Sequence, residues 1–581
     1  MTFQADLSAA QAHLQQGRFK PALKAARSAL RKQPKSALAA NIAGIALGRL
    51  GDHREAVAMF RKALKLDPGS ADARRNLAQT LIFLGQNKSA RALMQRQVDA
   101  SAGDAGAWYL LAQAELALGD AVAAETAATR CIAADPRQSR ALNLRALIRD
   151  RMGLLPEAIA DYEAALAINP DDVEALANMA LPLARQLRDG DALTALRRAV
   201  ALAPGHAGAR LRLAMHLAQS GAREDAIAAF RELLDMAPGH PEAIEQLAGL
   251  QDAADNRTLE PQARAALKSA PRRSEARASL NFALSRMAEQ SGDSRAAAAL
   301  LADANGDMAA RLPYDATADA AQHADLLERF DDPVAAAPPV GDDPRPVYVL
   351  GLPRSGTTLC EAVMGAHPAV AALGERAASG MLLQRIITEK LPFDASAVRQ
   401  FIDADALMRP DLTPGTKIWV DKMPENYRLI GFLMTAYPRA RIVNLTRDPR
   451  DVALSMWRGH FSGTALNYTY DMRAMAHRFN LYAQAMAHWR QVFPRAIMDL
   501  AYEDLVRDVE AASRRLAGFC GLEWHPEMAR PDRTAGQILT LSAAQLRQPV
   551  HARSIGGWRA HADELAPFIA GLDPGLWPQI R

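Results

Sequence analysis

Proline recurs through the first half of this 581-residue chain at a spacing of 34 residues or twice 34. The positions in this register are Pro34, Pro68, Pro136, Pro170, Pro204 and Pro238, with Ala102 at the one position that lacks proline. Glycine keeps the same period from Gly17 to Gly221, with Leu187 in place of one glycine, and an alanine stands five residues after each of these positions. A period of this length requires a fold built from stacked copies of one small unit.

Each register has a physical role in a pair of antiparallel helices. Glycine suits the tight turn between the helices, alanine lets them approach closely, and proline ends the second helix because it has no N–H to donate. The stretch GDHREAVAMFRKALKLDPGSADARRNLAQTL, which begins at Gly51, resembles the tetratricopeptide repeat. The resemblance covers roughly residues 4–250 and predicts about seven helical hairpins stacked into an all-α solenoid.

These observations divide the chain into three predicted parts. Residues 1–250 form the repeat array, whose concave face we expect to dock a protein partner or an acceptor; a role in rigidity or dimerisation is the alternative. Residues 251–345 form a helical connector and linker, because an Ala-rich helical pattern gives way to FDDPVAAAPPVGDDPRP. Residues 346–581 form a second domain.

Composition narrows the function classes. A formal net charge of +4 is small for this length, which disfavours a nucleic-acid binder driven by bulk charge and leaves room for a local basic site. The three cysteines lie far apart, so no zinc site or disulfide framework is expected. No signal peptide and no membrane-spanning apolar run of ~20 residues is recognisable, and we expect a cytoplasmic protein.

The second half alternates short apolar runs with longer amphipathic stretches. The runs predict strands at 347–351, 417–421, 440–446 and 496–503. Such alternation is typical of an α/β three-layer domain with a central parallel sheet, resembling P-loop proteins. Ligands of these sheets bind at the carboxyl ends of the strands.

The first predicted strand runs into PRSGTT, the pattern of a loop that binds phosphate. A nucleoside-triphosphate loop, GxxxxGK[ST], carries a lysine after its second glycine. This loop keeps Gly351 and Gly356 at that spacing, but Thr357 stands where the lysine would be. The loop therefore predicts a single 5′-phosphate-like group, without triphosphate or Mg²⁺ chemistry.

A second anion site is predicted about a hundred residues later. In TRDPRDVALSMW, Arg447 directly follows a strand and Ser455 comes eight residues after it. Eight residues are about two helical turns, so both side chains can face one anion. Two anion sites on one sheet fit a nucleotide that carries phosphates at its 5′ and 3′ positions.

The whole domain resembles the PAPS-dependent sulfotransferases, most closely the tyrosylprotein sulfotransferases and related bacterial proteins. Six ordered segments between about 345 and 570 carry the resemblance: PRSGTT, GAHPAVAALGE, VDKMPENY, TRDPRDVALSMW, AYEDLV and LSAAQLRQPVHARSIGGWRAH. The resemblance implies PAPS (3′-phosphoadenylyl sulfate) as co-substrate, PAP as product, and no metal.

The resemblance also implies residue roles. The nucleotide-binding residues are Arg354, Ser355, Gly356, Thr357 and Thr358 in the 5′ loop, Arg447 and Ser455 at the 3′-phosphate, and Tyr502. The implied catalytic residues are Glu375, Lys422 and Ser542, with Thr540 as the nearest substitute for Ser542. The chain departs from the family pattern where Gly557, instead of Lys or Arg, precedes Trp558, and Arg553 or Arg559 is the candidate to supply that charge.

The expected reaction moves SO₃ from PAPS to an acceptor hydroxyl. Glu375 is the expected general base, with His367 as the alternative, and Lys422 and Ser542 are expected to stabilise charge on the departing group. A protein tyrosine is one candidate acceptor, and carbohydrates, lipids and small phenols remain alternatives. Other functions left open are a non-catalytic repeat scaffold that only binds nucleotide and a nucleotide kinase or NTPase, which Thr357 disfavours.

Overall fold

The computed structural model describes residues 2–330, 344–388, 394–461, 463–531 and 550–580. It comprises two compact units, Met1–Met179 and Ala180–Arg581. The boundary between them falls inside a helix of the repeat region. Packing therefore divides the chain differently from the sequence pattern, and the domain boundaries predicted at residues 250 and 345 stay predictions.

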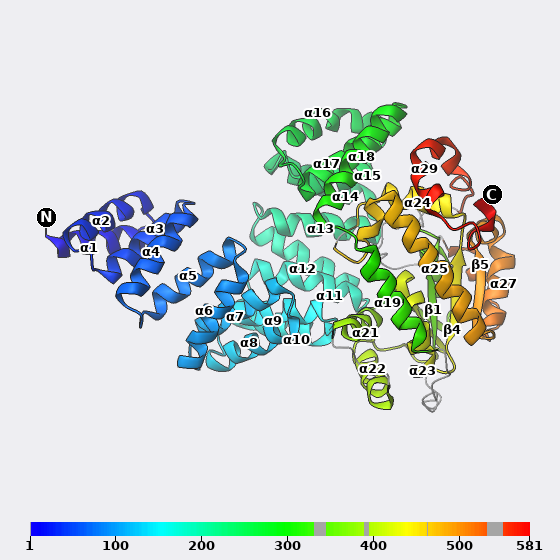
Figure 1. Ribbon diagram of the computed structural model, residues 1–581, viewed down its shortest axis with the longest axis horizontal. Coiled ribbons are helices and arrows are strands. Elements are labelled where there is room, and N and C mark those ends of the chain that lie inside the picture. Colours follow the sequence, from blue (N-terminus) through cyan, green and yellow to red (C-terminus); the bar gives the residue numbers. More distant parts are fainter. Residues whose placement is uncertain (1, 331–343, 389–393, 462, 532–549, 581) are drawn as a thin grey trace. The chain divides into compact units, whose positions relative to one another are not determined.

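Helical hairpins make up the first unit (Figure 1). Its helices are α1 (Phe3–Gln15), α2 (Phe19–Lys32), α3 (Ala37–Arg49), α4 (His53–Leu66), α5 (Ala71–Phe83), α6 (Asn87–Ala100), α7 (Ala105–Leu118), α8 (Ala121–Ala134), α9 (Ser139–Arg151) and α10 (Leu155–Ile168), while α11 (Val173–Arg185) contains the boundary. Ser36 caps α3 by accepting a hydrogen bond from the Ala39 amide at 3.2 Å. The alanine register is fully buried, as at Ala22 and Ala56, because a larger side chain would separate the packed helices.

The turn between the two helices of a repeat adopts a left-handed backbone. The glycines of this register have φ between 69° and 88°, values that a residue with a Cβ adopts only at a cost. Leu187, which replaces one of these glycines, adopts the same conformation with φ of 60°. The stacking of the repeats therefore imposes the turn even where the sequence disfavours it.

Replacing Leu187 by Gly is expected to stabilise the protein by about 0.5–1 kcal/mol. The left-handed conformation costs a non-glycine residue roughly 1–2 kcal/mol, and glycine avoids this cost. Glycine is also more flexible in the unfolded chain, which offsets about half of the stability gained. The leucine side chain is 58% exposed, so little packing is lost. Denaturant unfolding measures the change. The matched control is Leu202→Gly, at an exposed leucine of helix α12, which should lower the free energy of unfolding by about 1 kcal/mol. If Leu187→Gly also lowered the free energy of unfolding, the proposed backbone strain at Leu187 would be contradicted.

The second unit begins with further helices, which pack against one another as hairpins. They are α12 (Asp189–Leu202), α13 (Ala207–Ser220), α14 (Arg223–Met236), α15 (Pro241–Leu250), α16 (Ala253–Ser269), α17 (Glu275–Gln290), α18 (Ser294–Arg311) and α19 (Ala316–Glu328). One apolar core runs from Ala214 on α13 to Met287 on α17. Helices α16 to α18, where the sequence repeat has decayed, therefore remain part of the helical stack, whereas α19 packs against α25 and η1 of the sheet domain. No helix within the described ranges has the length and apolar character needed to cross a bilayer.

A five-stranded sheet with the order β2-β3-β1-β4-β5 forms the rest of the unit, and all its neighbouring strands are parallel. The strands are β1 (Arg345–Gly351), β2 (Val370–Ala372), β3 (Ile418–Lys422), β4 (Arg441–Thr446) and β5 (Ile497–Ala501). The helices and 3-10 turns around them are α20 (Thr357–Gly365), α21 (Ala377–Thr388), α22 (Ala395–Leu407), η1 (Pro424–Leu429), α23 (Ile430–Ala436), α24 (Pro449–Trp457), η2 (Asn467–Tyr470), α25 (Met472–Val492), α26 (Tyr502–Arg507), α27 (Val509–Phe519), η3 (Pro526–Ala529), η5 (Gly557–His561), α29 (Ala562–Gly571) and η6 (Pro578–Ile580).

Helices cover both faces of the sheet, which confirms the predicted fold class of a helical solenoid followed by a three-layer α/β domain (Figure 1). Side chains alternate along β1: Val347 and Val349 pack toward α20 and α27, whereas Tyr348 lies edge-on to Trp419 among the helices of the opposite layer. Two strand predictions need correction. The short strand β2 was missed, since three small residues give no period, and the strand predicted at 496–503 ends at Ala501 because helix α26 begins at Tyr502.

Candidate active site

The predicted site residues gather where the strands end. β1 lies between β3 and β4, and its last residue, Gly351, is opposite Leu445. Lys422 closes β3, Arg447 directly follows β4, and Tyr502 directly follows β5. Because the carboxyl ends of parallel strands share one edge of the sheet, the fold brings these motifs from distant parts of the sequence to that edge.

The loop after β1 has an unusual backbone that only small residues permit. Gly351 and Gly356 have φ of 145° and 108°. A Cβ on Gly351 would lie 2.6 Å from the carbonyl oxygen of Leu445, and one on Gly356 would lie 2.5 Å from a ring carbon of Tyr502. These contacts wrap the loop tightly over β4 and the start of α26, so its amides and those at the start of α20 are held in a fixed arrangement.

Ser355 and the two threonines supply hydroxyls to this loop. All three side chains are buried, and the amide of Ser355 donates to the carbonyl oxygen of Leu352 at 3.1 Å. The hydroxyl of Ser355 is buried without a hydrogen-bond partner among the described residues. An unpaired buried hydroxyl beside a helix N-terminus fits a ligand that accepts hydrogen bonds, and a phosphate group does so.

Arg447 fastens the loop to the C-terminal part of the chain. Its guanidinium donates to the carbonyl oxygen of Arg354 at 3.1 Å and to that of Ser554 at 2.8 Å, and it stacks on the ring of Tyr502 at 4.4 Å. Its Nε is buried with no hydrogen-bond partner in the described part of the chain. The hydroxyl of Tyr502 in turn lies 3.0 Å from that of Ser554. Arg447 is therefore held in a fixed position, and its Nε–H is left to donate a hydrogen bond to a ligand.

Arg354 joins the two predicted anion motifs directly. Its Nε donates to the hydroxyl of Ser455 at 3.0 Å, across 101 positions of sequence. Its backbone is left-handed, with φ of 70°, a strained conformation for arginine that the hydrogen bond from Arg447 helps to hold. Burial, together with the like charges of Arg447 and Arg286, lowers the pKa of the Arg354 guanidinium to about 10. Positive charge is therefore concentrated here, which favours an anionic ligand.

The described part of the C-terminal segment, from residue 550, packs over α24. Asp451 accepts hydrogen bonds from the amides of Gly556 at 2.7 Å and Trp558 at 3.0 Å. Arg450 stacks on the Trp558 ring at 3.8 Å, and Arg559 lies near the same ring at 5.4 Å. Arg450 of α24 and Arg559 of the C-terminal segment therefore place positive charge at Trp558 even though Gly557 precedes it.

Glu375 and Lys422 form a close pair. The Lys422 ammonium is almost fully buried and lies 2.5 Å from a carboxylate oxygen of Glu375, whose side chain is 41% exposed. Lys422 therefore sits at the bottom of the site with Glu375 between it and solvent. A partly exposed carboxylate on a buried cation can reach an incoming hydroxyl while staying oriented.

Glu361 holds the turn that precedes Glu375. This buried carboxylate accepts a hydrogen bond from the amide of Gly374 at 2.7 Å, while the amide of Lys422 donates to the Gly374 carbonyl at 2.9 Å. Burial raises the pKa of the Glu361 carboxyl, and the positive charge of Lys422 opposes that shift. Glu361 is a positioning residue, since it acts through the backbone of the Gly374 turn.

Asp421, the sequence neighbour of Lys422, faces the other way. Successive strand residues point to opposite faces of a sheet, so Asp421 lies near Arg376 and the buried ring of Tyr348. Burial raises the pKa of Asp421 to about 7, and Arg376 opposes the shift. Arg376 also forms an ion pair with Asp405, so these groups belong to a structural network behind the site.

His367, the alternative base, has both ring nitrogens in hydrogen bonds. One nitrogen accepts from the amide of Ala369 at 3.0 Å, and the other lies 3.0 Å from the carbonyl oxygen of Glu523. Burial lowers the pKa of the His367 imidazole, which keeps it neutral. This geometry favours a role in the turn that leads into β2.

The structure thus brings the predicted nucleotide-binding residues into one cluster and pairs Glu375 with Lys422. Ser542 and Thr540 lie outside the described residues. The sequence reasoning missed four contributors: Glu361, Asp451, Ser554 and Arg286. The signals of three were weak, because Glu361 and Arg286 are single charged residues on helices, and Ser554 acts through its backbone oxygen as well as its hydroxyl. Asp451 lies within TRDPRDVALSMW and could have been found there.

Comparisons with known proteins agree with both halves. Residues 346–526 match the Sulfotransferase family, and residues 7–71, 49–102, 109–173 and 180–241 match the Tetratricopeptide repeat. An uncharacterized protein of Aquifex aeolicus (strain VF5) is 31% identical over 252 residues, which cover 40% of this chain and 33% of that protein. The chain therefore spans only a third of the length of this relative.

Two further relatives carry names that describe an activity. A putative protein-tyrosine sulfotransferase of Caenorhabditis briggsae is 24% identical over 39% of this chain and 88% of its own length. Protein-tyrosine sulfotransferase A of Caenorhabditis elegans is 24% identical over 40% of this chain and 68% of its own length. Among solved structures, a thermophilic TPR protein of Thermus thermophilus aligns with 32% of this chain and all of its own, at 25% identity and a TM-score of 0.29. The chain carries tetratricopeptide repeats in its N-terminal half and a domain of the sulfotransferase family in its C-terminal half.

Proposed function

We propose that this protein transfers a sulfuryl group from PAPS to an acceptor hydroxyl. The observation that carries the proposal is the hydrogen bond between Arg354 and Ser455, which joins the loop after β1 to helix α24 at 3.0 Å and is flanked by Arg447. Two anion-binding motifs held together at one sheet edge suit a nucleotide with phosphates at two positions. The neighbouring pair of Glu375 and Lys422 supplies an acid–base group and a buried cation.

Each residue has a defined task in this reaction. PAPS, when bound, supplies a transferable sulfuryl group on its 5′-phosphate. The amides at the start of α20, with Ser355, Thr357 and Thr358, bind and orient that end of the nucleotide. A carboxylate oxygen of Glu375 takes the proton of the acceptor hydroxyl, because a neutral hydroxyl is a poor nucleophile. The Lys422 ammonium holds positive charge beside this oxygen and is poised to stabilise charge on the departing phosphate.

A thermal-shift experiment tests the nucleotide assignment. PAP at a hundred times its dissociation constant should stabilise the protein by about 2.7 kcal/mol and raise its Tm, whereas ATP with Mg²⁺ should not. Stabilisation by ATP–Mg²⁺ but not by PAP would instead support a nucleotide kinase or NTPase. If neither nucleotide stabilised the protein, the proposal would be rejected. Turnover of labelled PAPS separates an enzyme from a scaffold that only binds the nucleotide.

A tyrosine side chain in a protein is the first acceptor to test. The support is the activity named for the two nematode relatives, which are 24% identical to this chain. A screen with labelled PAPS should therefore offer tyrosine peptides, sugars and small phenols side by side. If only sugars were sulfated, the acceptor would be a carbohydrate and not a tyrosine, and the assignment of the nucleotide site would be unaffected.

We also propose that the repeat array recruits an acidic protein segment through a basic face on its first two repeats. We define the basic face as the exposed side chains of Lys20, Lys24, Arg27 and Arg31 on α2 and Arg54, Arg61 and Lys65 on α4. Three of the basic residues on α2 have a basic counterpart 34 residues later on α4, so the repeat places each residue beside its counterpart. The ion pair of Arg27 with Glu55, at 2.5 Å, shows that α2 and α4 are neighbours.

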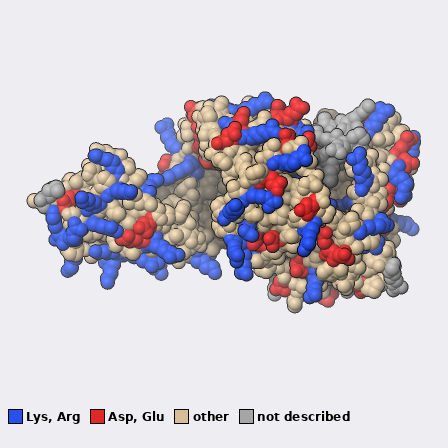
Figure 2. All heavy atoms as spheres, turned by 90° about the horizontal axis from the view of Figure 1, so that it is seen from above, with Lys and Arg blue, Asp and Glu red and all other residues tan. Residues whose placement is uncertain are grey.

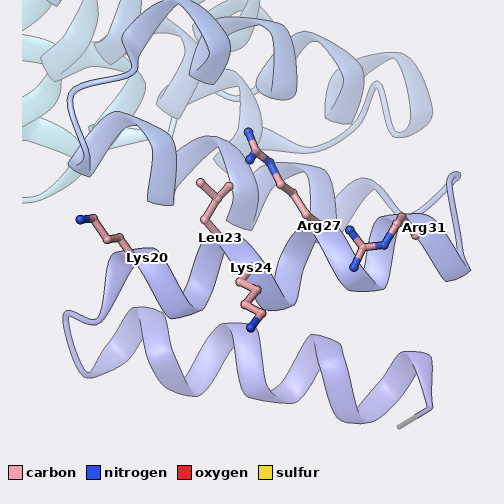
Figure 3. Close-up of a pocket in the computed structure, with 5 residues that line it drawn as sticks. All are labelled: Lys20, Leu23, Lys24, Arg27 and Arg31. Carbon is pink, nitrogen blue, oxygen red and sulfur yellow. The ribbon is translucent and has the colours of Figure 1, made fainter.

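The surroundings of the basic face fit such a partner. The first 70 residues hold 12 Lys and Arg against 4 Asp and Glu, although the whole chain carries only +4. Figure 2 shows Lys and Arg side chains gathered at the N-terminal end. A hollow of about 320 Å³ lies along α2, and Figure 3 shows the residues that line it: Lys20, Leu23, Lys24, Arg27 and Arg31. In the third repeat Lys88 stands at the position equivalent to Arg54, but Gln95 and Asp99 replace the basic residues at the other two, so the basic face weakens after two repeats. A short acidic segment matches this extent better than a long nucleic-acid backbone does.

Charge reversal tests the basic face. Lys24→Glu combined with Arg31→Glu should weaken binding of a labelled 15-residue Glu-rich peptide at least tenfold in fluorescence polarisation. The control, Arg137→Glu with Arg151→Glu, changes the same charge at exposed positions of α9 and the turn before it, and should leave binding unchanged. Equal losses of peptide affinity in both double variants would show that binding depends only on net charge, and would reject the basic face as the binding site. Tighter binding of single-stranded RNA than of the peptide would reject the proposed partner class.

A further inference from the structure

Helix α17 lies outside the residues that match the sulfotransferase family, yet it packs against the catalytic domain. Phe282 on α17 stacks on the ring of His460 with 5.0 Å between centroids. The same helix and α18 share an apolar cluster with Trp457, Phe461 and Tyr470, at the end of helix α24 and after it. The helical part of the second unit is therefore joined to the segment that begins just after Ser455.

Polar contacts fix the same interface. Glu289, near the end of α17, forms an ion pair with Arg458, the residue that caps α24. Asn305 on α18 donates to the carbonyl oxygen of Trp457 at 2.9 Å. The His460 imidazole lies 2.9 Å from the Glu245 carboxylate on α15. With both apolar and charged contacts, the orientation of α17 toward α24 is well defined.

Arg286 lies between the two contacts that α17 makes. Positions 282, 286 and 289 are four and three residues apart, the spacing of side chains on one face of a helix. Phe282 reaches His460 and Glu289 reaches Arg458. The Arg286 guanidinium between them lies beside Gly249 of α15, 3.2 Å from where a Cβ on that glycine would be, and near enough to Arg354 to act on its charge. Arg458 is one helical turn beyond Ser455, so Arg286 is carried toward the Ser455 end of the anion site.

The charge environment of Arg286 points to an anion. Its side chain is exposed, and its guanidinium has no hydrogen bond or ion pair among the described residues. It lies close enough to Arg354 that its charge, together with that of Arg447, contributes to the lowered pKa of Arg354. The nearest acid on its own face, Glu289, is already paired with Arg458. Three guanidiniums therefore approach one place, and like charges are brought together in this way where a multiply charged anion binds.

We propose that Arg286 binds the 3′-phosphate of the nucleotide, so that helix α17 forms part of the PAPS site. This inference rests on the proposed function. It gives the helices beyond the repeats a direct part in cofactor binding, in addition to linking the repeats to the catalytic domain. It also adds a third candidate, beside Arg553 and Arg559, for the positive charge that Gly557 does not supply.

Nucleotide binding by isothermal calorimetry tests the proposal on the full chain. Arg286→Ala should raise the Kd for PAP roughly tenfold to a hundredfold, the range for a hydrogen bond to a charged group. The Kd for 5′-AMP, which lacks the 3′-phosphate, should change less than twofold. Arg286→Lys should recover part of the loss. The control is Arg272→Ala, an exposed arginine that precedes α17 and lies beyond the end of the helix farthest from Arg286, which should bind PAP like the wild type.

The outcomes separate the two proposals. If the wild type fails to bind PAP, the proposed function is wrong, and this inference falls with it. If the wild type binds PAP and Arg286→Ala binds it equally well, only the role of Arg286 is wrong. Equal weakening of PAP and 5′-AMP would overturn the contact to the 3′-phosphate. An unchanged melting temperature of each variant without ligand confirms that its fold is intact.

Discussion

Replacing Glu375 by Gln is expected to lower kcat for sulfuryl transfer by a factor of roughly 10²–10⁴ while leaving PAP affinity within about twofold. Glutamine keeps the size of the side chain and an oxygen that can face Lys422, but it cannot take a proton from the acceptor. The nucleotide-binding contacts of Arg354 and Arg447 do not involve Glu375, so binding should persist. Single-turnover transfer from labelled PAPS and calorimetry with PAP measure the two quantities separately.

The matched control for this prediction is Glu510→Gln. Glu510 is a carboxylate on the surface helix α27 that pairs with Arg514, and its loss should change neither turnover nor PAP binding. Turnover that survives in Glu375→Gln would move the general base to another residue. Loss of PAP binding in that variant would show that the pair with Lys422 supports the nucleotide site itself.

Gly356→Ala is expected to reduce PAP affinity by more than a hundredfold. The new Cβ would lie 2.5 Å from a ring carbon of Tyr502, and the backbone at φ of 108° is itself costly for alanine. Either the ring or the loop must move, and both are parts of the proposed nucleotide site. Calorimetry with PAP gives the affinity, and the melting temperature without ligand shows whether the fold remains.

Two further variants separate the cause of that loss. Gly415→Ala has a comparable left-handed backbone, with φ of 92°, but open space around the new Cβ, so it should cost stability without affecting PAP. Combining Gly356→Ala with Tyr502→Ala removes the clash and should lose less affinity than the sum of the two single variants. Wild-type PAP binding in Gly356→Ala would contradict the close packing of this loop.

The sequence predicted the repeat array well because its signals are local and repeated. Most hairpins carry the same turn glycine, buried alanine and terminal proline. The period therefore remains recognisable where one copy departs from it, as at Leu187. The strands were also predictable as short apolar runs, except β2, whose three residues at 370–372 carry neither length nor period. Tyr502 was assigned to a strand because an aromatic residue after an apolar run gives no sign that a helix begins there.

The site was predictable where its residues occur in compact motifs. PRSGTT and TRDPRDVALSMW each hold several groups in a few residues, and the fold joins them through Arg354 and Ser455. Glu361 and Arg286 could not be found in this way, since each acts alone and its partners come from distant parts of the chain. Their relevance depends on how helices pack, which no short stretch of sequence records.

The packing of α17 and α18 on the segment after α24 means that the family domain is not a self-sufficient folding unit. A polypeptide that began at residue 346 would leave Trp457, Phe461 and Tyr470 without the apolar partners that cover them in the full chain. It would also leave Arg458 without Glu289 and His460 without Glu245. The portion of the chain that can be expressed and purified as a soluble catalytic fragment therefore has to begin before α15, within the last of the predicted repeats.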